Sequence, residues 1–492
     1  MAIISTPSSQ SGEPAAKPTV VLVALWGVSH FAPMVEAGKR LLDLSGRSLT
    51  VNVVLVPSPT GKWEDAIFER IRREEASGQG IRFHHPAAVE PPTDHTGIEE
   101  FVSRYVQLYV ADLKAIVSGL ACPVAAVVVD IFCTTLLDAP LELGVPAYVF
   151  LTCGAAMAAV LLRSPSLDEE VAAEVEFREL EGGVDVPGLP PVPATNLPSG
   201  LDNRKIRTYK WFLYNGRRYL ETNGILINTI AELEESVLAA ITDGRCTRGI
   251  PTPPVYTIGP VVAIAPPSEE KDECVRWLDS QPAASVLFLC FGGGGGYFSV
   301  PQVHEIAQGL ERSGHRFLWV LRGQPEPGMK VPTDANLAEL LPDGFLERTK
   351  GRGLVWPTRA PQKEILAHAA VGGFVTHCGW NSSVESLWFG VPTLPWPQAA
   401  EQHLNAFVLV AEMGVAVGMK VDKERRNFVE AAELERAVKA LMGDGEVARK
   451  IREKSAEMKA VCRKAVEEGG SSVVSLQRLY DALIQGAVEP KV

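Results

Sequence analysis

Short runs of valine, isoleucine and leucine that do not alternate with polar residues recur along the whole chain. Examples are TVVLVAL (19–25), VNVVLV (51–56) and VAAVVVD (124–130) in the first half, and SVLFLCF (285–291) and RFLWVL (316–321) in the second. Helix-length amphipathic stretches separate them. A strand that is apolar on both faces must be covered on both faces, which is the property of parallel sheets flanked by helices. The pattern predicts an α/β fold.

A break in the pattern divides the chain. The segment VAIAPPSEEKDE (262–273) is rich in proline, serine and charge, as expected of an interdomain linker. We therefore predict two doubly wound, Rossmann-like domains that face each other across a cleft at the carboxyl ends of their strands. The expected divisions are a tail at 1–18, a first domain at 19–261, the linker, a second domain at 274–474, and a C-terminal helix at 475–492 that packs back on the first domain.

Charge and cysteine usage exclude several classes of protein. A formal net charge of -12 argues against nucleic acid as a partner. The longest apolar stretch is interrupted by Asp130, so no integral membrane segment is expected. The eight cysteines include no C-x-x-C pair, which favours a reducing cytoplasm and provides no metal site. The N-terminal residues lack the apolar core of a secretory signal. We expect a cytoplasmic monomer without a metal.

The segment GGFVTHCGWNSSVESLWFGVP (372–392) has a histidine, a tryptophan, an asparagine and a glutamate where a strand leads into a helix. An ordinary strand-to-helix connection needs only a cap and a glycine or two. The segment has the pattern of a buried strand, a short turn, and a helix beginning near Asn381 and ending at Gly390. Asn381 and Ser382 fall in the first helical turn, where free amides and the helix dipole favour a phosphate. Glu385, four residues on, shares that face and is placed to bind a ribose diol. The alternative is an ordinary helix start with a core tryptophan.

The longer segment from Arg359 to Gln402, RAPQKEILAHAAVGGFVTHCGWNSSVESLWFGVPTLPWPQAAEQ, resembles without a gap the donor box of plant secondary-product UDP-sugar glycosyltransferases. The resemblance extends to CVRWLDSQPAASVLFLCFG (274–292) and NGILINTIAELE (223–234), and so covers most of the chain. It implies the GT-B fold and a UDP-sugar as co-substrate. The donor-binding residues that it implies are Arg359, Ala360 and Gln362 at the uridine, His377, Asn381 and Ser382 at the diphosphate, Glu385 at the ribose, and Trp380, Glu401 and Gln402 at the sugar.

Three positions of the donor site bear on its details. The family usually has a tryptophan that stacks on uracil where this chain has Arg359, whose planar guanidinium can also stack on a base. The family has a serine near the phosphate where this chain has Gly293, inside a run of five glycines; a loop without ligand contact is the alternative there. Glutamine at position 402 is usual in glucose users, so glucose is favoured, and UDP-galactose stays open.

A histidine and an aspartate in the first half are candidates for the chemistry. The strand at 19–25 leads into a helix through His30, and the family carries its catalytic base in a Gly-x-Gly-His turn at this place. Gly27 and His30 match that turn, whereas Ser29 replaces its second glycine. Asp130 ends a buried strand and needs a partner. The resemblance pairs it with His30, and a helix cap is the alternative.

These residues predict an inverting glycosyltransferase of plant secondary metabolism. His30 would deprotonate a hydroxyl of a small phenolic acceptor such as a flavonoid or anthocyanidin, and the oxygen would attack the sugar from the face opposite UDP. The alternatives are a nucleotide-sugar binding protein without turnover, C-glycosyl or galactosyl transfer, and a nicotinamide-dependent oxidoreductase. The last lacks a G-x-G-x-x-G after the first strand.

Overall fold

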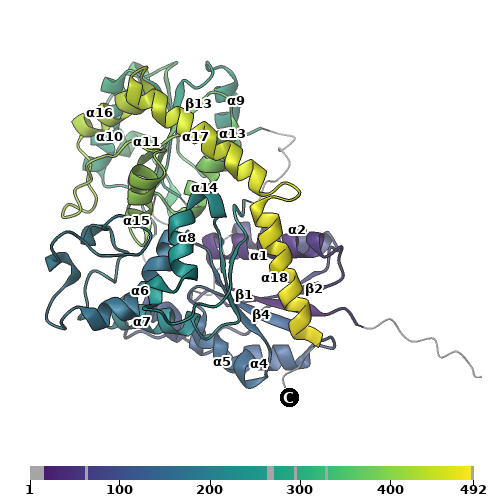
Figure 1. Cartoon of the computed structure of the whole chain (residues 1–492). Coiled ribbons are helices and arrows are strands. Elements are labelled where there is room, and N and C mark those ends of the chain that lie inside the picture. Colours follow the sequence, from purple (N-terminus) through teal and green to yellow (C-terminus); the bar gives the residue numbers. More distant parts are fainter. Residues whose placement is uncertain (1–15, 61–64, 263–270, 293–295, 327–330, 489–492) are drawn as a thin grey trace, which may run out of the picture.

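The computed structural model describes residues 16–60, 65–262, 271–292, 296–326 and 331–488. The chain forms two lobes, each built around one parallel sheet with helices on both faces (Figure 1). The doubly wound α/β architecture expected from the sequence is therefore confirmed. Of the expected linker, residues 263–270 lie outside the described part of the chain.

The first lobe holds a seven-stranded sheet in the order β3-β2-β1-β4-β5-β6-β7, in which all neighbours are parallel. Alternate residues of β1 enter two different cores: Val21 and Val23 face one, whereas Val20 and Leu22 face the other. Both faces are buried, which explains why the strands are apolar without alternation. The strands are β1 (Thr19–Ala24), β2 (Thr50–Leu55), β3 (Ile81–His84), β4 (Val124–Asp130), β5 (Ala147–Leu151), β6 (Gly224–Ile227) and β7 (Val255–Thr257).

Helices cover both faces of this sheet. They form the crossover connections that parallel strands require. They are α1 (Val28–Leu44), α2 (Asp65–Ala76), α3 (Ile98–Gln107), α4 (Val110–Gly119), α5 (Asp138–Glu142), α6 (Ala155–Glu170), α7 (Arg207–Tyr219) and α8 (Glu235–Thr242).

The second lobe holds a five-stranded parallel sheet in the order β12-β9-β8-β13-β14. A two-stranded ribbon of β10 (Arg322–Gly323) and β11 (Thr333–Asp334) lies beside it. The sheet strands are β8 (Val286–Cys290), β9 (Arg316–Val320), β12 (Gly353–Trp356), β13 (Val371–Thr376) and β14 (Thr393–Pro395). Its helices are α9 (Glu273–Asp279), α10 (Val300–Ser313), α11 (Leu337–Leu340), α12 (Phe345–Arg348), α13 (Gln362–Ala367), α14 (Trp380–Phe389), α15 (Gln402–Phe407), α16 (Ala431–Met442) and α17 (Glu446–Ala465).

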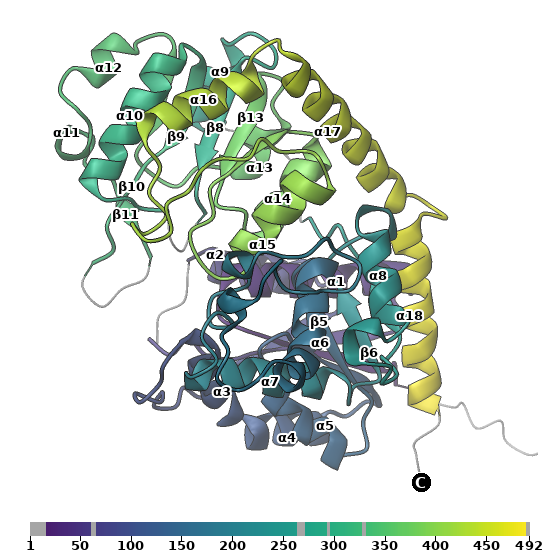
Figure 2. The same ribbon diagram turned by 60° about the vertical axis from the view of Figure 1, so that its left-hand side comes forward.

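The last helix, α18 (Ser471–Val488), returns to the first lobe. Leu476, Leu479 and Leu483 are buried in the core that β1 and β2 share with α1. Figure 2 shows α17 and α18 running in succession along one side of the molecule, from the second lobe to the first. At the junction, the Ser472 hydroxyl donates to the carbonyl oxygen of Gly259. The chain thus crosses between the lobes a second time. Among the described residues, no helix is both long enough and apolar enough to cross a membrane.

Candidate active site

His30 and Asp130 meet where two neighbouring strands of the first sheet end. The imidazole Nδ1 lies 2.9 Å from Asp130 Oδ2, the aspartate is fully buried, and the histidine side chain is 23% exposed. The second carboxylate oxygen, Oδ1, accepts the backbone N–H of Phe132 at 3.1 Å. Asp130 therefore serves both as the partner of His30 and as a cap for the turn that follows β4. With Nδ1 directed at the carboxylate, Nε2 is left for another group.

The charge around His30 favours its protonated form. Burial lowers the pKa of the imidazole, but the charge and hydrogen bond of Asp130 and the charge of Glu401 outweigh it, so the pKa lies above its ordinary value of 6.5. Glu401 belongs to the second lobe, between β14 and α15. The basicity of His30 is therefore set by both lobes.

The start of α14 lies at the junction with the first lobe (Figure 2). The helix begins at Trp380, one residue before the expected start, and its cap residue Gly379 offers no side-chain hydrogen bond. Among the described residues, none accepts a hydrogen bond from the amides of Asn381 and Ser382. The Asn381 Nδ2 donates to the carbonyl oxygen of Ser29 at 2.9 Å. Because Ser29 precedes His30, the candidate diphosphate site lies beside the candidate base.

His377 is a buried neutral imidazole at the end of β13. Burial lowers its pKa to about 4, and its Nδ1 has no hydrogen-bond partner in the described part of the chain. A Cβ added to Gly292 or Gly379 would lie 2.8 Å or 2.5 Å from the ring. Only glycine at these two positions leaves room for the imidazole, which supports a ligand-facing role for His377. Gly293, the neighbouring position expected at the phosphate, lies outside the described residues.

Gln362, Ser382 and Glu385 form one hydrogen-bonded group between α13 and α14. The Gln362 Nε2 donates to Ser382 Oγ at 2.9 Å and to Glu385 Oε2 at 2.7 Å. Burial raises the pKa of Glu385, and the Gln362 hydrogen bond and the charge of Lys363 offset part of that rise. The residues expected at the uridine and at the ribose thus lie together.

Arg359 and Ala360 precede this group in the loop after β12. Arg359 is exposed, and within the described chain its guanidinium forms no ion pair and stacks on no ring. Its carbonyl oxygen accepts the indole N–H of Trp356 at 3.4 Å. The guanidinium is therefore available to a ligand, and its stacking on uracil stays a prediction.

Trp380, Glu401 and Gln402 have protein partners of their own. The Trp380 indole is buried and donates to the carbonyl oxygen of Asn228 in the first lobe at 2.7 Å. Glu401 accepts the Asn405 amide at 3.3 Å, and Gln402 Oε1 accepts the backbone N–H groups of Gln398 and Ala399. The indole joins the lobes, while sugar binding by these three residues stays a prediction.

Glu234 is a residue that the sequence reasoning did not single out. Its carboxylate is buried and accepts the backbone N–H groups of Ala155 and Ala156, both at 2.8 Å, and the Thr229 hydroxyl at 2.6 Å. Burial raises the pKa of Glu234, and these three hydrogen bonds offset part of that rise. Glu234 therefore occupies the N-terminus of α6. The sequence carried no signal for this contact beyond one acidic residue after a strand.

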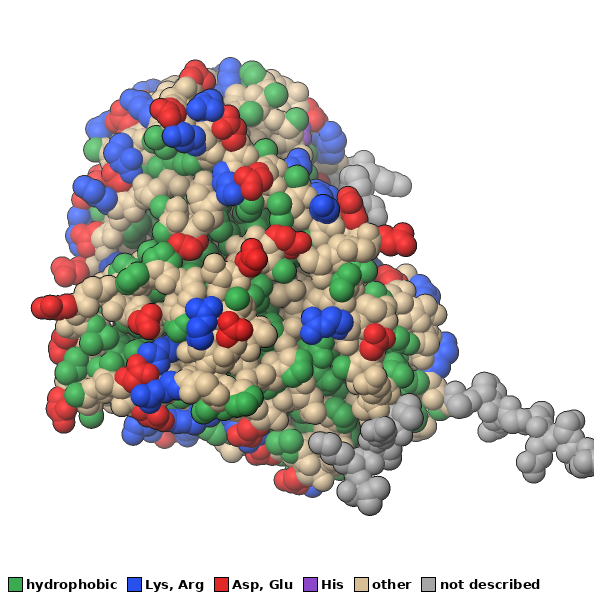
Figure 3. Space-filling model, viewed as in Figure 1, with side chains coloured by type: hydrophobic (Ala, Val, Ile, Leu, Met, Phe, Trp, Pro, Cys, Tyr) green, Lys and Arg blue, Asp and Glu red, His purple; other side chains and the backbone are tan. Residues whose placement is uncertain are grey.

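The described residues include no group of three or more His, Cys, Asp or Glu side chains that could hold a metal ion. On the face shown in Figure 3, basic and acidic side chains are interspersed and form no continuous basic surface.

Comparison with known proteins agrees with this geometry. Residues 255–456 match the family model described as UDP-glucoronosyl and UDP-glucosyl transferase. A rice protein (Oryza sativa subsp. japonica) named malvidin galactosylase UGT88C3 is 62% identical over 482 residues, which cover 96% of this chain and 99% of that protein. An anthocyanidin 5,3-O-glucosyltransferase from a Rosa hybrid cultivar is 38% identical over 469 residues, covering 94% of this chain and 98% of that protein.

Solved structures show the same relation over the whole chain. A UDP-glucosyltransferase from Polygonum tinctorium superposes with a TM-score of 0.83 at 34% identity, covering 96% of this chain and 100% of that chain. Medicago truncatula UGT71G1, solved with UDP-glucose, gives a TM-score of 0.81 at 33% identity, covering 95% and 98%. The fold is that of GT-B glycosyltransferases, and the chain belongs to the plant UDP-glycosyltransferase family. It is an enzyme of that class.

Proposed function

We propose that the enzyme transfers a hexosyl group from a UDP-sugar to a phenolic hydroxyl of a flavonoid or anthocyanidin, with inversion at the anomeric carbon. One observation carries the proposal. The His30–Asp130 pair is linked to the open start of α14 through the hydrogen bond from Asn381 to Ser29. A base beside a diphosphate site is the arrangement that direct displacement of UDP requires. The names of the rice and rose relatives support the acceptor class.

The chemistry follows from the geometry of these residues. Nε2 of His30 takes the proton of the acceptor hydroxyl, while Asp130 fixes the tautomer and stabilises the imidazolium that forms. The acceptor oxygen attacks the anomeric carbon from the face opposite the diphosphate. The amides of Asn381 and Ser382, the dipole of α14 and the neutral imidazole of His377 bind the departing diphosphate. We propose that these groups stabilise the leaving charge without a metal ion.

The identity of the sugar is tested by two donors. Glutamine at position 402 favours glucose, whereas the name of the rice relative supports galactose. We place the reaction in the cytosol because the eight cysteines are free, as expected of a reducing compartment. We propose that the enzyme acts as a monomer.

The deciding assay incubates the enzyme with malvidin or kaempferol and with UDP-glucose or UDP-galactose, and identifies products by chromatography and NMR. We expect a β-linked O-glycoside from an α-linked donor. An α-linked product would contradict inversion, and a C-linked product would contradict O-transfer. UDP binding by calorimetry without any product would favour the alternative of a binding protein without turnover.

A further inference from the structure

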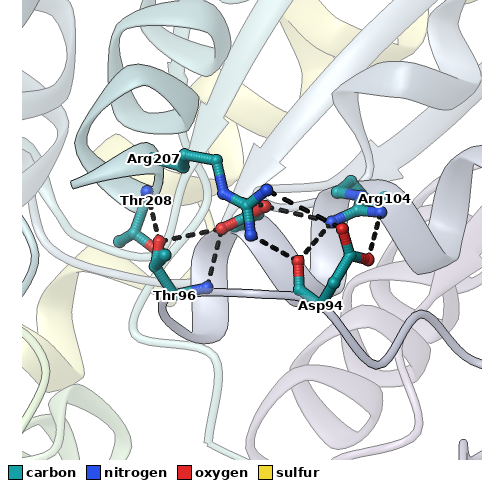
Figure 4. Close-up of polar contacts among 6 residues, drawn as sticks. Asp94, Thr96, Arg104, Arg207 and Thr208 are labelled. Carbon is teal, nitrogen blue, oxygen red and sulfur yellow. Dashed lines mark hydrogen bonds and ion pairs between the residues drawn. The ribbon is translucent and has the colours of Figure 1, made fainter.

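Two adjacent glutamates in the first turn of α3 have different surroundings although both are buried. Glu99 is 5% exposed and Glu100 is 1% exposed. Glu100 accepts hydrogen bonds from Thr96, and its carboxylate pairs with Arg104 at 3.0 Å and Arg207 at 3.1 Å. Figure 4 shows this network, which ties the loop before α3 to α7. In the described part of the chain, Glu99 has no Lys, Arg or His partner.

The carboxylate of Glu99 faces a loop that touches the second lobe. A Cβ placed on Gly200 would lie 3.4 Å from Glu99 Oε2. The preceding residue, Ser199, donates its backbone N–H to the carbonyl oxygen of Ala400 at 3.1 Å. Ala400 is followed by Glu401, whose charge also acts on His30. Glu99 therefore lies at the contact between the lobes, and the charge of Glu401 acts on it as well as on His30.

The electrostatics of Glu99 agree with this position. Burial, with a smaller contribution from the charges of Glu401 and Asp202, raises the pKa of Glu99 to about 7, and a hydrogen bond from the residue's own backbone N–H offsets part of that rise. A buried carboxyl without a cationic partner is costly to keep. Such groups cluster at functional sites, where a ligand can supply the missing partner.

Aromatic side chains connect α3 to the turn that carries His30. Trp26, four residues before His30, meets the Tyr105 ring edge-on with centroids 5.5 Å apart. Tyr105 stacks on Phe101 with centroids 5.9 Å apart. Tyr105 is fully buried in the core, so only the half-buried rings of Trp26 and Phe101 can offer a flat surface to a planar polyphenol. The helix that carries Glu99 is thus tied to the turn that carries His30 through one aromatic cluster.

We propose that Glu99 binds the acceptor, its carboxylate accepting a hydrogen bond from an acceptor hydroxyl other than the one that attacks the sugar. The inference rests on the proposed function and adds a residue that determines acceptor specificity. A competing explanation is that Glu99 only stabilises the N-terminus of α3 through the helix dipole. The two explanations predict opposite changes in stability and different acceptor profiles.

The test compares Glu99→Leu with the matched control Glu100→Leu. The acceptors are kaempferol and two analogues that each lack one hydroxyl, galangin and apigenin, with the preferred UDP-sugar held saturating. In the wild type we expect loss of one hydroxyl to lower kcat/KM by about 10–100-fold, the range for a hydrogen bond to a charged group. In Glu99→Leu, removing the same hydroxyl from the acceptor should lower kcat/KM by less than about 3-fold. The KM of the donor should stay unchanged.

Stability supplies the second measurement. Glu99→Leu removes a buried carboxyl that has no cationic partner and should keep or raise the Tm. Glu100→Leu removes the buried carboxylate that Arg104 and Arg207 share and leaves these arginines only the exposed Asp94, so it should lower the Tm while the ratios of kcat/KM among the acceptors stay as in the wild type. Glu99→Gln, which retains an oxygen acceptor without the charge, should restore part of the preference.

Unchanged acceptor ratios in both Glu99 variants would overturn the inference, as would a Tm drop in Glu99→Leu equal to that of Glu100→Leu. Calorimetric binding of the same three acceptors to UDP-saturated enzyme separates this failure from failure of the proposed function. If no glycoside forms but binding still depends on residue 99 and on one hydroxyl, the proposed function fails and the acceptor site stands. If glycosides form without that dependence, the inference alone fails.

Discussion

The helices α6 and α14 begin in the same way but use their N-termini differently. Each follows a glycine with extended or near-extended backbone, Gly154 or Gly379, and neither cap residue supplies a side-chain hydrogen bond. In α6 the first amides donate to the buried carboxylate of Glu234. In the described chain, no group accepts from the amides of Asn381 and Ser382 in α14. The amide of Trp380, the first residue of α14, donates to the buried carboxylate of Glu401, so in α14 the next two amides are the ones left for a ligand.

The two helix starts also touch. A Cβ on Gly154 would lie 2.7 Å from the ring of Trp380, so the first residue of α14 packs directly on the cap of α6. The difference teaches that a helix start keeps amides for an anion where the acid that the fold supplies reaches only its first residue. On this view the first lobe provides the base and helix α6, whose N-terminal amides are already bound by Glu234. The second lobe provides the open donor site. The variants below test that division, from the largest expected effect to the smallest.

His30→Ala should separate chemistry from donor binding most clearly. We expect kcat to fall by about 10²–10⁴-fold, the usual contribution of a general base. The Kd for UDP, measured by calorimetry, should stay within about 2-fold of the wild type because the nucleotide is held by the second lobe. Near wild-type kcat with a phenolic acceptor would show that another group is the base.

Glu234→Ala should affect stability rather than donor recognition. It orphans the amides of Ala155 and Ala156 and the Thr229 hydroxyl, and we expect the free energy of unfolding to fall by about 3 kcal/mol. Urea denaturation measures the change. The matched control is Glu235→Ala, the exposed neighbour, which should cost less than about 0.5 kcal/mol. Equal losses in the two variants would mean that α6 does not depend on this carboxylate.

Asp130→Asn should change the pH dependence of the reaction. In the wild type the acid limb of the kcat/KM profile should have its midpoint above 6.5, since the active form of His30 is neutral and its pKa is raised. The variant removes the Asp130 charge, leaving burial to lower the pKa of His30. The acid limb should therefore move to lower pH, while the plateau rate falls by about 10–100-fold because the base is weaker. An unmoved limb would separate Asp130 from the titration of His30.

Glu385→Ala is the counterpart of Glu234→Ala in the second lobe. It removes a buried carboxylate whose partner Gln362 is a neutral amide, so the cost in stability should be small. The affinity for UDP should fall by about 1–3 kcal/mol, the range for a lost hydrogen bond to a charged group. Calorimetry and thermal unfolding of the same sample give both numbers. Unchanged UDP affinity would place Glu385 outside the ribose site.

Arg359 should give the smallest effect. If its exposed guanidinium stacks on uracil, Arg359→Ala should weaken UDP binding by about 1 kcal/mol, whereas Arg359→Trp should keep or improve it because an indole offers a larger aromatic face. Calorimetry on the three proteins measures this. Equal affinities in all three would show that the side chain makes no contact with the base.

The donor side could be predicted in detail because its parts are contiguous in the sequence. The strand before His377, the glycine turn and the helix that carries Asn381 and Glu385 follow one another within a few residues, and local rules fix such an order. The same rules identified the central strands of both sheets, since burial on two faces leaves an apolar run in the sequence. They missed the short edge strands β3 and β7, which are only partly buried. The position of the helix start was missed by one residue, because Gly379 rather than a polar side chain caps α14.

Contacts between distant segments were decided by the tertiary structure. The pairing of His30 with Asp130 was expected through the family resemblance, but the closure of α6 by Glu234 had no sequence signal. The hydrogen bond from Asn381 to Ser29 joins residues that are 352 positions apart, and it had no sequence signal either. The sequence by itself determined the α/β class, the central strands and the donor segment, because periodicity and caps act over a few residues. Which carboxylates end up paired, and which remain for a ligand, depends on how the lobes pack, and no local pattern encodes that.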